Sequence, residues 1–150
     1  MNIDCFGNGA RFHHIGVAVY AIQDVCPKCH PIYDPLQSVN VAFISLNGCN
    51  LELIESTGED SPVAAGLKRG IKLLHVCYEV DDIEDALRKC RSHGFHVIRQ
   101  PTPATAFDQR RIAFVSSRTF GVVELLESGT AARSASDDFS AVVGGQPGHK

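Results

Sequence analysis

Several features that would identify a broad class of protein are missing from this chain of 150 residues. No apolar run approaches the ~18–20 residues that span a bilayer, so we predict no transmembrane helix and no membrane partner. Residues 1–10 lack the basic and apolar regions of a signal peptide, and we therefore expect the protein in the cytoplasm. The net charge of −3 and the pI of about 6.1 give no basic footprint for nucleic acid.

Motifs of several common chemistries are missing too. No Gly-rich phosphate loop follows a predicted strand, and there is no Gly-x-Ser-x-Gly elbow. Residues 26–30 (CPKCH) fit a haem-attachment string and half of a zinc site, but no second C-x-x-C pair accompanies them. We interpret these cysteines as surface-loop residues. Without a secretion signal, we expect all six cysteines to be reduced, with Cys77 and Cys90 as small core residues.

The composition that remains is typical of one soluble globular domain, with 44% hydrophobic and 21% charged residues. Residues 1–10 are polar and contain glycine, and residues 129–150 are rich in Ala, Ser, Gly and Asp. Such segments bury too little apolar surface to offset the entropy of ordering them. We therefore expect both to be flexible and place the domain in residues 11–128.

An internal repeat is the strongest signal in the chain. Three pairs of segments recur in the same order, which indicates a duplication rather than chance. The pairs are residues 14–19 (HIGVAV) with 75–80 (HVCYEV), 41–45 (VAFIS) with 112–116 (IAFVS), and 51–56 (LELIES) with 123–128 (VELLES). We name residues 11–57 the first module and residues 71–128 the second module. A short helix within residues 60–69, with Pro62 in its first turn, is expected to link them.

The second module shows the repeated unit in full. Its first strand is followed by a helix, for which Asp81 and Glu84 resemble a capping box and Gly94 marks the end. Three further strands follow the helix. The first module is abbreviated, because residues 21–26 allow only one or two helical turns, while its strands at 39–46 and 49–55 are complete. The pattern predicts an α+β fold of two βαβββ modules.

Two histidines and two glutamates recur at equivalent positions of the modules: His14, Glu52, His75 and Glu124. Related halves pack about a pseudo-twofold axis, so we expect these four side chains to converge on one cavity, with the histidine ring nitrogens within roughly 6 Å of each other. Imidazole and carboxylate suit Zn, Ni, Co, Mn or Fe(II). A lone histidine in a strand is usually structural, but the repetition favours a metal site. His13, His30, His93, His96 and His149 lack a counterpart and are interpreted as surface or tail residues.

The paired His and Glu modules resemble the vicinal oxygen chelate superfamily, which includes glyoxalase I, methylmalonyl-CoA epimerase, extradiol dioxygenases and antibiotic-resistance proteins. The resemblance covers residues 11–128, through residues 12–19 (FHHIGVAV), 74–83 (LHVCYEVDDI) and 121–127 (GVVELLE). It implies a curled mixed sheet around a central metal cavity, with His14 and His75 as ligands.

Within the superfamily, residues 51–56 followed by 60–64 (DSPVA) are most similar to the methylmalonyl-CoA epimerase branch. This resemblance implies proton transfer on an acyl thioester or keto acid, with a divalent metal stabilising an enolate and Glu52 or Glu124 as general base. The abbreviated residues 20–38, and Ser117 and Arg118 in place of the family's His-Pro, indicate a specialised biosynthetic relative rather than a housekeeping epimerase.

Three alternatives remain open at this stage. A glyoxalase I-like lyase uses the same ligand set, a metal-free binding or resistance protein fits the abbreviated first module, and an oxygen-activating enzyme leaves Glu52 unexplained. Arg110 and Arg111 are interpreted as a solvated strand end, with a substrate carboxylate or phosphate as the second interpretation. We expect a small-molecule substrate such as an acyl-CoA, and a homodimer because the fold leaves sheet edges exposed.

Overall fold

The computed structural model describes residues 3–59 and 61–129; Asp60 and most of the tail expected to be flexible, residues 130–150, lie outside them. The first module contains β1 (Arg11–Val19), α1 (Ile22–Val25), β2 (Ile32–Asp34), β3 (Val39–Leu46) and β4 (Cys49–Ser56). The linking helix is α2 (Pro62–Lys68). The second module contains β5 (Leu73–Val80), α3 (Ile83–Ser92), β6 (His96–Pro103), the 3-10 turn η1 (Thr105–Phe107), β7 (Arg111–Ser117) and β8 (Gly121–Glu127).

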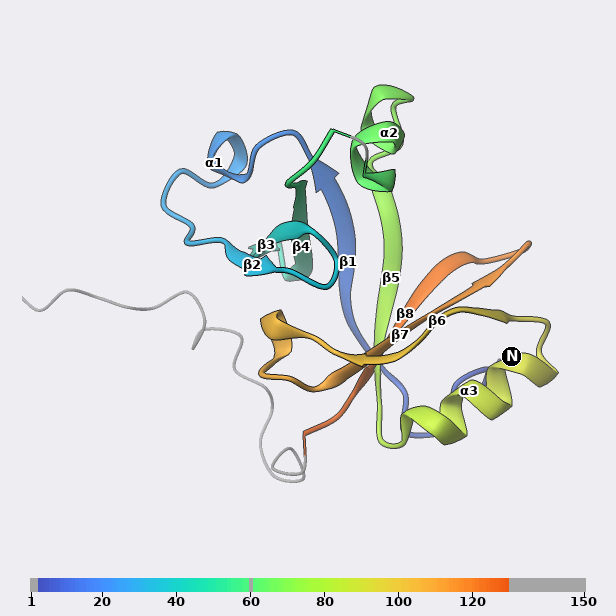
Figure 1. The fold of residues 1–150 in the computed structure, drawn as a ribbon. Coiled ribbons are helices and arrows are strands. Elements are labelled where there is room, and N and C mark those ends of the chain that lie inside the picture. Colours follow the sequence, from blue (N-terminus) through green and yellow to red (C-terminus); the bar gives the residue numbers. More distant parts are fainter. Residues whose placement is uncertain (1–2, 60, 130–150) are drawn as a thin grey trace, which may run out of the picture.

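The eight strands form one mixed, curled sheet in the order β2-β3-β4-β1-β5-β8-β7-β6 (Figure 1). The two halves of the sheet have the same strand arrangement. In each module the first strand lies at the centre of the sheet and pairs in parallel with the last strand, β1 with β4 and β5 with β8. β1 and β5 run antiparallel through the centre and join the two modules. The predicted α+β fold of two βαβββ modules in one curled mixed sheet is confirmed.

Local sequence explains where several elements begin and end. Asn47 and Gly48 both have positive φ, of 50° and 83°, and form the tight turn between β3 and β4. Ser61 caps α2 by accepting a hydrogen bond from the Ala64 N–H, and Pro62 occupies its first turn.

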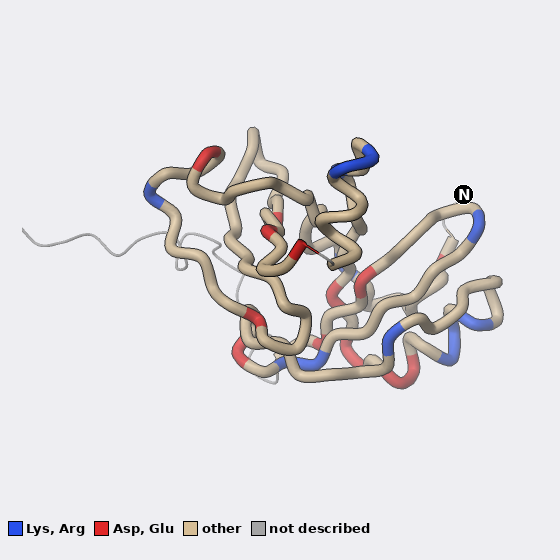
Figure 2. The backbone as a smooth tube through the Cα atoms, turned by 45° about the horizontal axis from the view of Figure 1, so that its top comes forward, with Lys and Arg blue, Asp and Glu red and all other residues tan. Residues whose placement is uncertain are grey.

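The prediction for the start of α3 is displaced by one residue. Asp82, rather than Asp81, is the N-cap and accepts from the Asp85 N–H. Asp82 holds the extended backbone that an N-cap requires, and Glu84 reaches out to Arg111 instead of back to the cap. The acidic residues of α3 lie in its first turn, and the basic residues of its last turn lie toward the other end (Figure 2). None of the described helices is long and apolar enough to cross a membrane.

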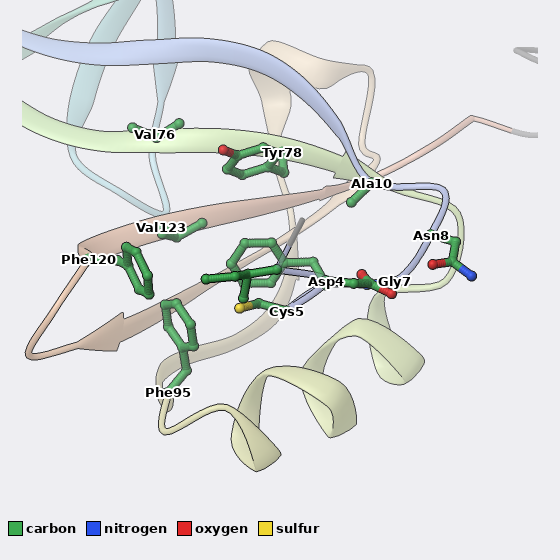
Figure 3. Close-up of a pocket in the computed structure, with 12 residues that line it drawn as sticks. Asp4, Cys5, Gly7, Asn8, Ala10, Val76, Tyr78, Phe95, Phe120 and Val123 are labelled. Carbon is green, nitrogen blue, oxygen red and sulfur yellow. The ribbon is translucent and has the colours of Figure 1, made fainter. Parts of the chain in front are cut away.

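The expectation that residues 1–10 lie outside the fold is wrong for residues 3–10. Cys5 is buried in the core between α3 and the second-module sheet, and the Phe6 ring lies 5.3 Å from that of Phe95. The segment also lines a cavity of about 400 Å³ with Tyr78 and Phe120 (Figure 3). Although the segment is polar overall, two of its side chains, Cys5 and Phe6, pack against one face of the second-module sheet.

The cysteines divide into two groups. Cys77 and Cys90 are fully buried, as predicted for small core residues. Cys26 and Cys29 form a disulfide, so the expectation of six reduced thiols is wrong for this pair. A turn, in which the Cys29 N–H donates to the Cys26 carbonyl, brings the two together against the Ile22 core. The expected redox compartment bears on all six thiols alike, whereas this disulfide depends on a local turn that places two of them side by side.

Candidate metal centre

The four central strands each contribute one side chain to a single buried cluster. His14 lies on β1, Glu52 on β4, His75 on β5 and Glu124 on β8. Their exposed fractions are 0%, 5%, 8% and 2%, in that order. The sequence therefore predicted the convergence of these four residues, and the two modules supply one histidine and one glutamate each.

The atoms that could bind an ion approach one another closely. Nε2 of His14 lies 3.3 Å from Nε2 of His75 and 3.2 Å from Oε2 of Glu52. Oε2 of Glu124 lies 2.9 Å from Nε2 of His75 and 3.3 Å from Nε2 of His14. The histidine separation is well inside the limit of roughly 6 Å that a shared ion imposes.

Two small residues make this packing possible. Gly16 pairs across the sheet with both Glu52 and His75, and a Cβ placed on it would lie only 2.3 Å from Cε1 of His75. Glycine is required there because the imidazole occupies the space of any larger side chain. At the equivalent position of the second module, Cys77 pairs with His14 and Glu124.

Burial and charge oppose each other at the cluster. Burial lowers the pKa of His75, but the carboxylates of Glu124 and Glu52 raise it by more, and the pKa is about 10. The same two carboxylates outweigh burial at His14 and raise its pKa as well. Burial raises the pKa of Glu124, and the two imidazoles lower it more, to about 2. The imidazoles thus favour the ionised form of Glu124, and the carboxylates favour the protonated forms of both histidines.

The cluster fits a divalent cation. With bonds of about 2.1 Å, neighbouring ligand atoms lie about 3.0 Å apart at right angles and about 3.4 Å apart in a tetrahedron. The measured separations among these donors span the same interval, from 2.9 to 3.4 Å. Oε2 of Glu124 is also buried without a hydrogen-bond partner of proper geometry, despite its approach to both imidazoles. A buried carboxylate oxygen of this kind is satisfied by a cation.

Aromatic side chains form one wall of the centre. Phe107 of η1 stacks on the His14 ring, with centroids 5.9 Å apart, and Phe43 of β3 meets that ring edge-on at 5.6 Å. Phe114 of β7 meets the His75 ring in the same way at 5.5 Å. These contacts fix the imidazole planes and keep the surroundings apolar.

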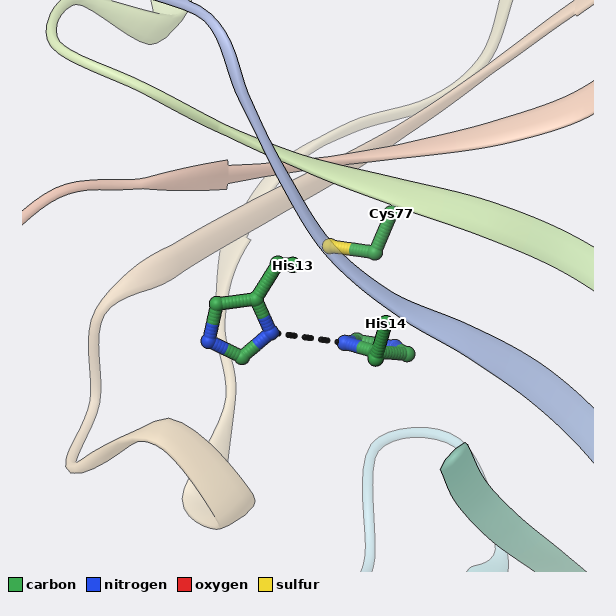
Figure 4. A group of neighbouring side chains, drawn as sticks. All are labelled: His13, His14 and Cys77. Atoms are coloured by element: carbon green, nitrogen blue, oxygen red, sulfur yellow. Dashed lines mark hydrogen bonds between the residues drawn. The ribbon is translucent and has the colours of Figure 1, made fainter. Parts of the chain in front are cut away.

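His13 is the residue that the sequence interpretation missed. It was predicted to lie on the surface, but it is half-buried and its Nδ1 lies 2.8 Å from Nδ1 of His14 (Figure 4). His30, His93 and His96 are exposed, as expected, and His149 lies outside the described residues.

The two arginines interpreted as a solvated strand end, with a substrate contact as the second interpretation, bind carboxylates of the protein itself. Arg110 donates to Glu79 at 2.9 Å, and Arg111 makes a two-point contact with Glu127 and a third with Glu84. The two side chains are 28% and 39% exposed at the start of β7, and three carboxylates of the second module hold their guanidinium groups.

Known proteins are similar to this chain over most of its length. The ethylmalonyl-CoA/methylmalonyl-CoA epimerase of Cereibacter sphaeroides is 27% identical over 128 residues, which cover 77% of this chain and 96% of the relative. The protein YqjC of Bacillus subtilis is 34% identical over 129 residues, covering 78% and 91%. The crystal structure of methylmalonyl-CoA epimerase from Mycobacterium tuberculosis has a TM-score of 0.66 at 19% identity, covering 86% of this chain and 93% of that one, and supports the fold alone.

Residues 13–114 match the family model of the glyoxalase/bleomycin resistance protein/dioxygenase superfamily. This match contains three of the four clustered donors, all of β5 and most of β1. The chain therefore belongs to that superfamily, the vicinal oxygen chelate proteins.

Proposed function

We propose that the protein is a metal-dependent epimerase- or isomerase-type enzyme that moves a proton on the carbon next to a thioester or keto group. The observation that carries this proposal is the buried cluster of His14, Glu52, His75 and Glu124, whose donor atoms have the separations of a coordination sphere. These four residues would hold the ion, of the Co, Ni, Zn, Mn or Fe class. When bound, the cation supplies Lewis acidity that stabilises an enolate.

The two carboxylates are suited to proton transfer. Glu52 comes from the first module and Glu124 from the second, so they approach the centre along different strands. Inversion at a carbon requires a base on one side and an acid on the other, which a pair of carboxylates can provide in alternation. We propose that one carboxylate would take the proton from one face of the carbon, and that the other, in its protonated form, would deliver a second proton to the opposite face. The apolar wall of Phe43, Phe107 and Phe114 excludes water from the exchange.

An acyl-CoA is the proposed substrate class. The Cereibacter sphaeroides relative, which matches over 96% of its own length, is an epimerase of ethylmalonyl-CoA and methylmalonyl-CoA. A malonyl-type thioester also offers two oxygens at the spacing that a chelating ion binds. In the first module α1 and β2 have four and three residues, against ten and eight in α3 and β6, and this abbreviation is consistent with a substrate other than methylmalonyl-CoA itself.

Elemental analysis tests the metal centre first. The purified protein should carry about one equivalent of a transition metal, and His75→Ala should carry none. His96→Ala is the matched control, because His96 is exposed on β6 and should leave the metal content unchanged. An absence of metal after reconstitution with Ni, Co, Zn and Mn would contradict the proposal and favour a metal-free binding protein.

Proton exchange in deuterated water tests the chemistry separately. Methylmalonyl-CoA and other 2-substituted acyl-CoA thioesters should gain deuterium at C2 with the metal-loaded protein. Glu52→Gln and Glu124→Gln should keep an oxygen donor yet lower exchange by about 10²–10⁴-fold. A metal-loaded protein that exchanges none of these substrates would retain the metal centre but refute the epimerase assignment.

A further inference from the structure

His13 owes its position to a β-bulge in β1. In the pairing of β1 with β5, Phe12 lies opposite Tyr78 and His14 lies opposite Cys77, so His13 is an extra residue between them. Consecutive side chains of a regular strand point to opposite faces. A bulge re-aims one of them, and here it turns the His13 ring toward that of its neighbour (Figure 4).

Two contacts hold His13 in place, one to its backbone and one to its ring. The Asn50 side chain on β4 donates to the His13 carbonyl at 3.3 Å, which binds the bulge to the next strand. The His13 ring meets Phe107 edge-on at 5.7 Å, and the same Phe107 stacks on His14. The two imidazoles are therefore fixed relative to each other by one aromatic side chain.

The distance of 2.8 Å between Nδ1 of His13 and Nδ1 of His14 requires one nitrogen to donate and the other to accept. Nε2 of His14 faces Glu52 and His75. It can offer a lone pair to a cation there only if the proton of the neutral ring is on Nδ1. Nδ1–H of His14 then donates to His13.

We propose that His13 is a positioning residue, which accepts the hydrogen bond from Nδ1–H of His14 and so fixes the ring orientation and tautomer in which Nε2 of His14 faces the ion. This inference rests on the metal centre proposed above. Metal-binding histidines generally donate their second N–H to a carboxylate, a carbonyl or water, and losing that acceptor typically costs 10–100-fold in metal affinity. Here a second imidazole takes that role.

The second module provides an internal comparison. Gly16 pairs with His75 and Val17 with Leu73, so Leu74 is the bulged residue before the second histidine. Leu74 packs against apolar residues of the first module and has no acceptor to offer His75. The bulge is thus common to both modules, whereas the imidazole acceptor belongs to the first alone.

Two substitutions separate the acceptor from the bulge. His13→Leu copies the residue that occupies the second-module bulge and removes the acceptor; His13→Asn keeps an acceptor oxygen close to the place of Nδ1. Affinity for Co(II) is measured by competition with a chelator, with the visible absorption of the bound Co(II) as a second readout and thermal unfolding to verify the fold. We expect His13→Leu to bind Co(II) about 10–100-fold more weakly with an altered spectrum, and His13→Asn to remain within about threefold of the parent.

Each other outcome has a definite meaning. Parent affinity in a folded His13→Leu would overturn the role of His13 and leave the metal centre intact. Equal weakening in both variants would overturn the acceptor role, because the amide oxygen would not have replaced Nδ1. A parent that binds no metal would overturn both this inference and the metal centre, whereas metal binding without proton exchange would refute only the epimerase assignment.

Discussion

The two modules share one frame but differ outside it. In both, the first strand pairs in parallel with the last, a bulge precedes the histidine, and a glutamate from the last strand meets that histidine. The helix differs most: α1 has four residues and no side-chain cap, while α3 has ten residues and a capping aspartate. The second strand also shortens, from eight residues in β6 to three in β2.

Residues at equivalent positions of the two modules therefore have different hydrogen-bond partners. Glu55 of β4 accepts from the Ile22 N–H at the start of α1, whereas the equivalent Glu127 of β8 binds Arg111. The comparison teaches that the duplicated frame supplies the four donors, and that the parts around them are free to diverge. Substitutions at equivalent positions of the two modules test this directly.

The largest effect is expected at Gly16 and Cys77, which occupy equivalent positions. In Gly16→Ala the new methyl would lie 2.3 Å from Cε1 and 2.5 Å from Nε2 of His75, so the ring must swing out of the cluster. We expect metal affinity to fall by about 100-fold or more, with a loss of about 1–3 kcal/mol in unfolding free energy from overpacking. Cys77→Ala shrinks a side chain and should leave affinity within a few-fold. Chelator competition on both variants measures the difference, and equal affinities would show that the modules are interchangeable here.

The four clustered donors could be predicted from the sequence because the duplication marks them. His14 and His75 open matching segments, and Glu52 and Glu124 close them, so a twofold arrangement was enough to bring them together. His13 could not be predicted in this way. Strand alternation places it opposite to His14, and only the pairing register of β1 with β5 reveals the bulge.

The pH dependence of metal binding comes next in size. Burial lowers the pKa of His75, but the carboxylates raise it to about 10, so the metal-free ring is protonated near neutral pH. An ion must displace that proton, and affinity should rise by about tenfold for each pH unit for each proton released. Titrations with Co(II) between about pH 6 and pH 8 measure the slope. A flat profile would contradict a protonated cluster.

The raised pKa of His75 also makes the stability of the metal-free protein depend on pH, but here a higher pH is unfavourable. The folded pKa of His75 lies above its ordinary value of 6.5, so the charged ring stabilises the metal-free protein fully below about pH 6.5. This contribution is lost as the pH rises toward 10. Thermal unfolding of the metal-free protein should therefore occur at lower temperature as the pH rises through this interval, while the metal-loaded protein should lack this trend.

A smaller effect is expected from Glu79, a buried glutamate of β5 whose first-module equivalent is Ala18. Arg11 of the first module and Arg110 of the second bind it at 2.6 and 2.9 Å. Burial raises the pKa of Glu79, but the two guanidinium groups lower it more, so its contribution holds above about pH 4.5 and is lost in acid.

Glu79→Gln should lower the unfolding free energy by about 1–2 kcal/mol, because both arginines are partly exposed and remain solvated. Asp85→Asn, in an exposed pair with Lys89, is the matched control and should lower the unfolding free energy much less, because solvent screens this pair. Urea unfolding at pH 7 measures both. A Glu79 variant no weaker than the control would show that this link between the modules adds nothing to stability.

Other features escaped the sequence for reasons of distance along the chain. Composition marks residues 1–10 as polar, yet Cys5 and Phe6 reach a core built from α3 and β8, far away in sequence. The Cys26–Cys29 disulfide depends on a local turn that compartment arguments do not address. By contrast, the hairpin at Asn47 and Gly48 was predictable because its positive φ angles are a property of those two residues.

The smallest effect distinguishes two neighbouring aspartates at the start of α3. The capping-box pattern favours Asp81, whereas the structure has Asp82 accepting from the Asp85 N–H at 2.9 Å. Asp82→Ala should therefore lower the unfolding free energy by about 1 kcal/mol through the lost cap. Asp81→Ala should cost less than about half of that, since Asp81 is exposed and its contact with Arg11 is 3.5 Å long. A larger loss in Asp81→Ala than in Asp82→Ala would show that Asp81 is the cap and that α3 begins one residue earlier. α1 has no side-chain cap. The same measurement therefore gives the stability that α3 gains from its capping aspartate and that α1 lacks.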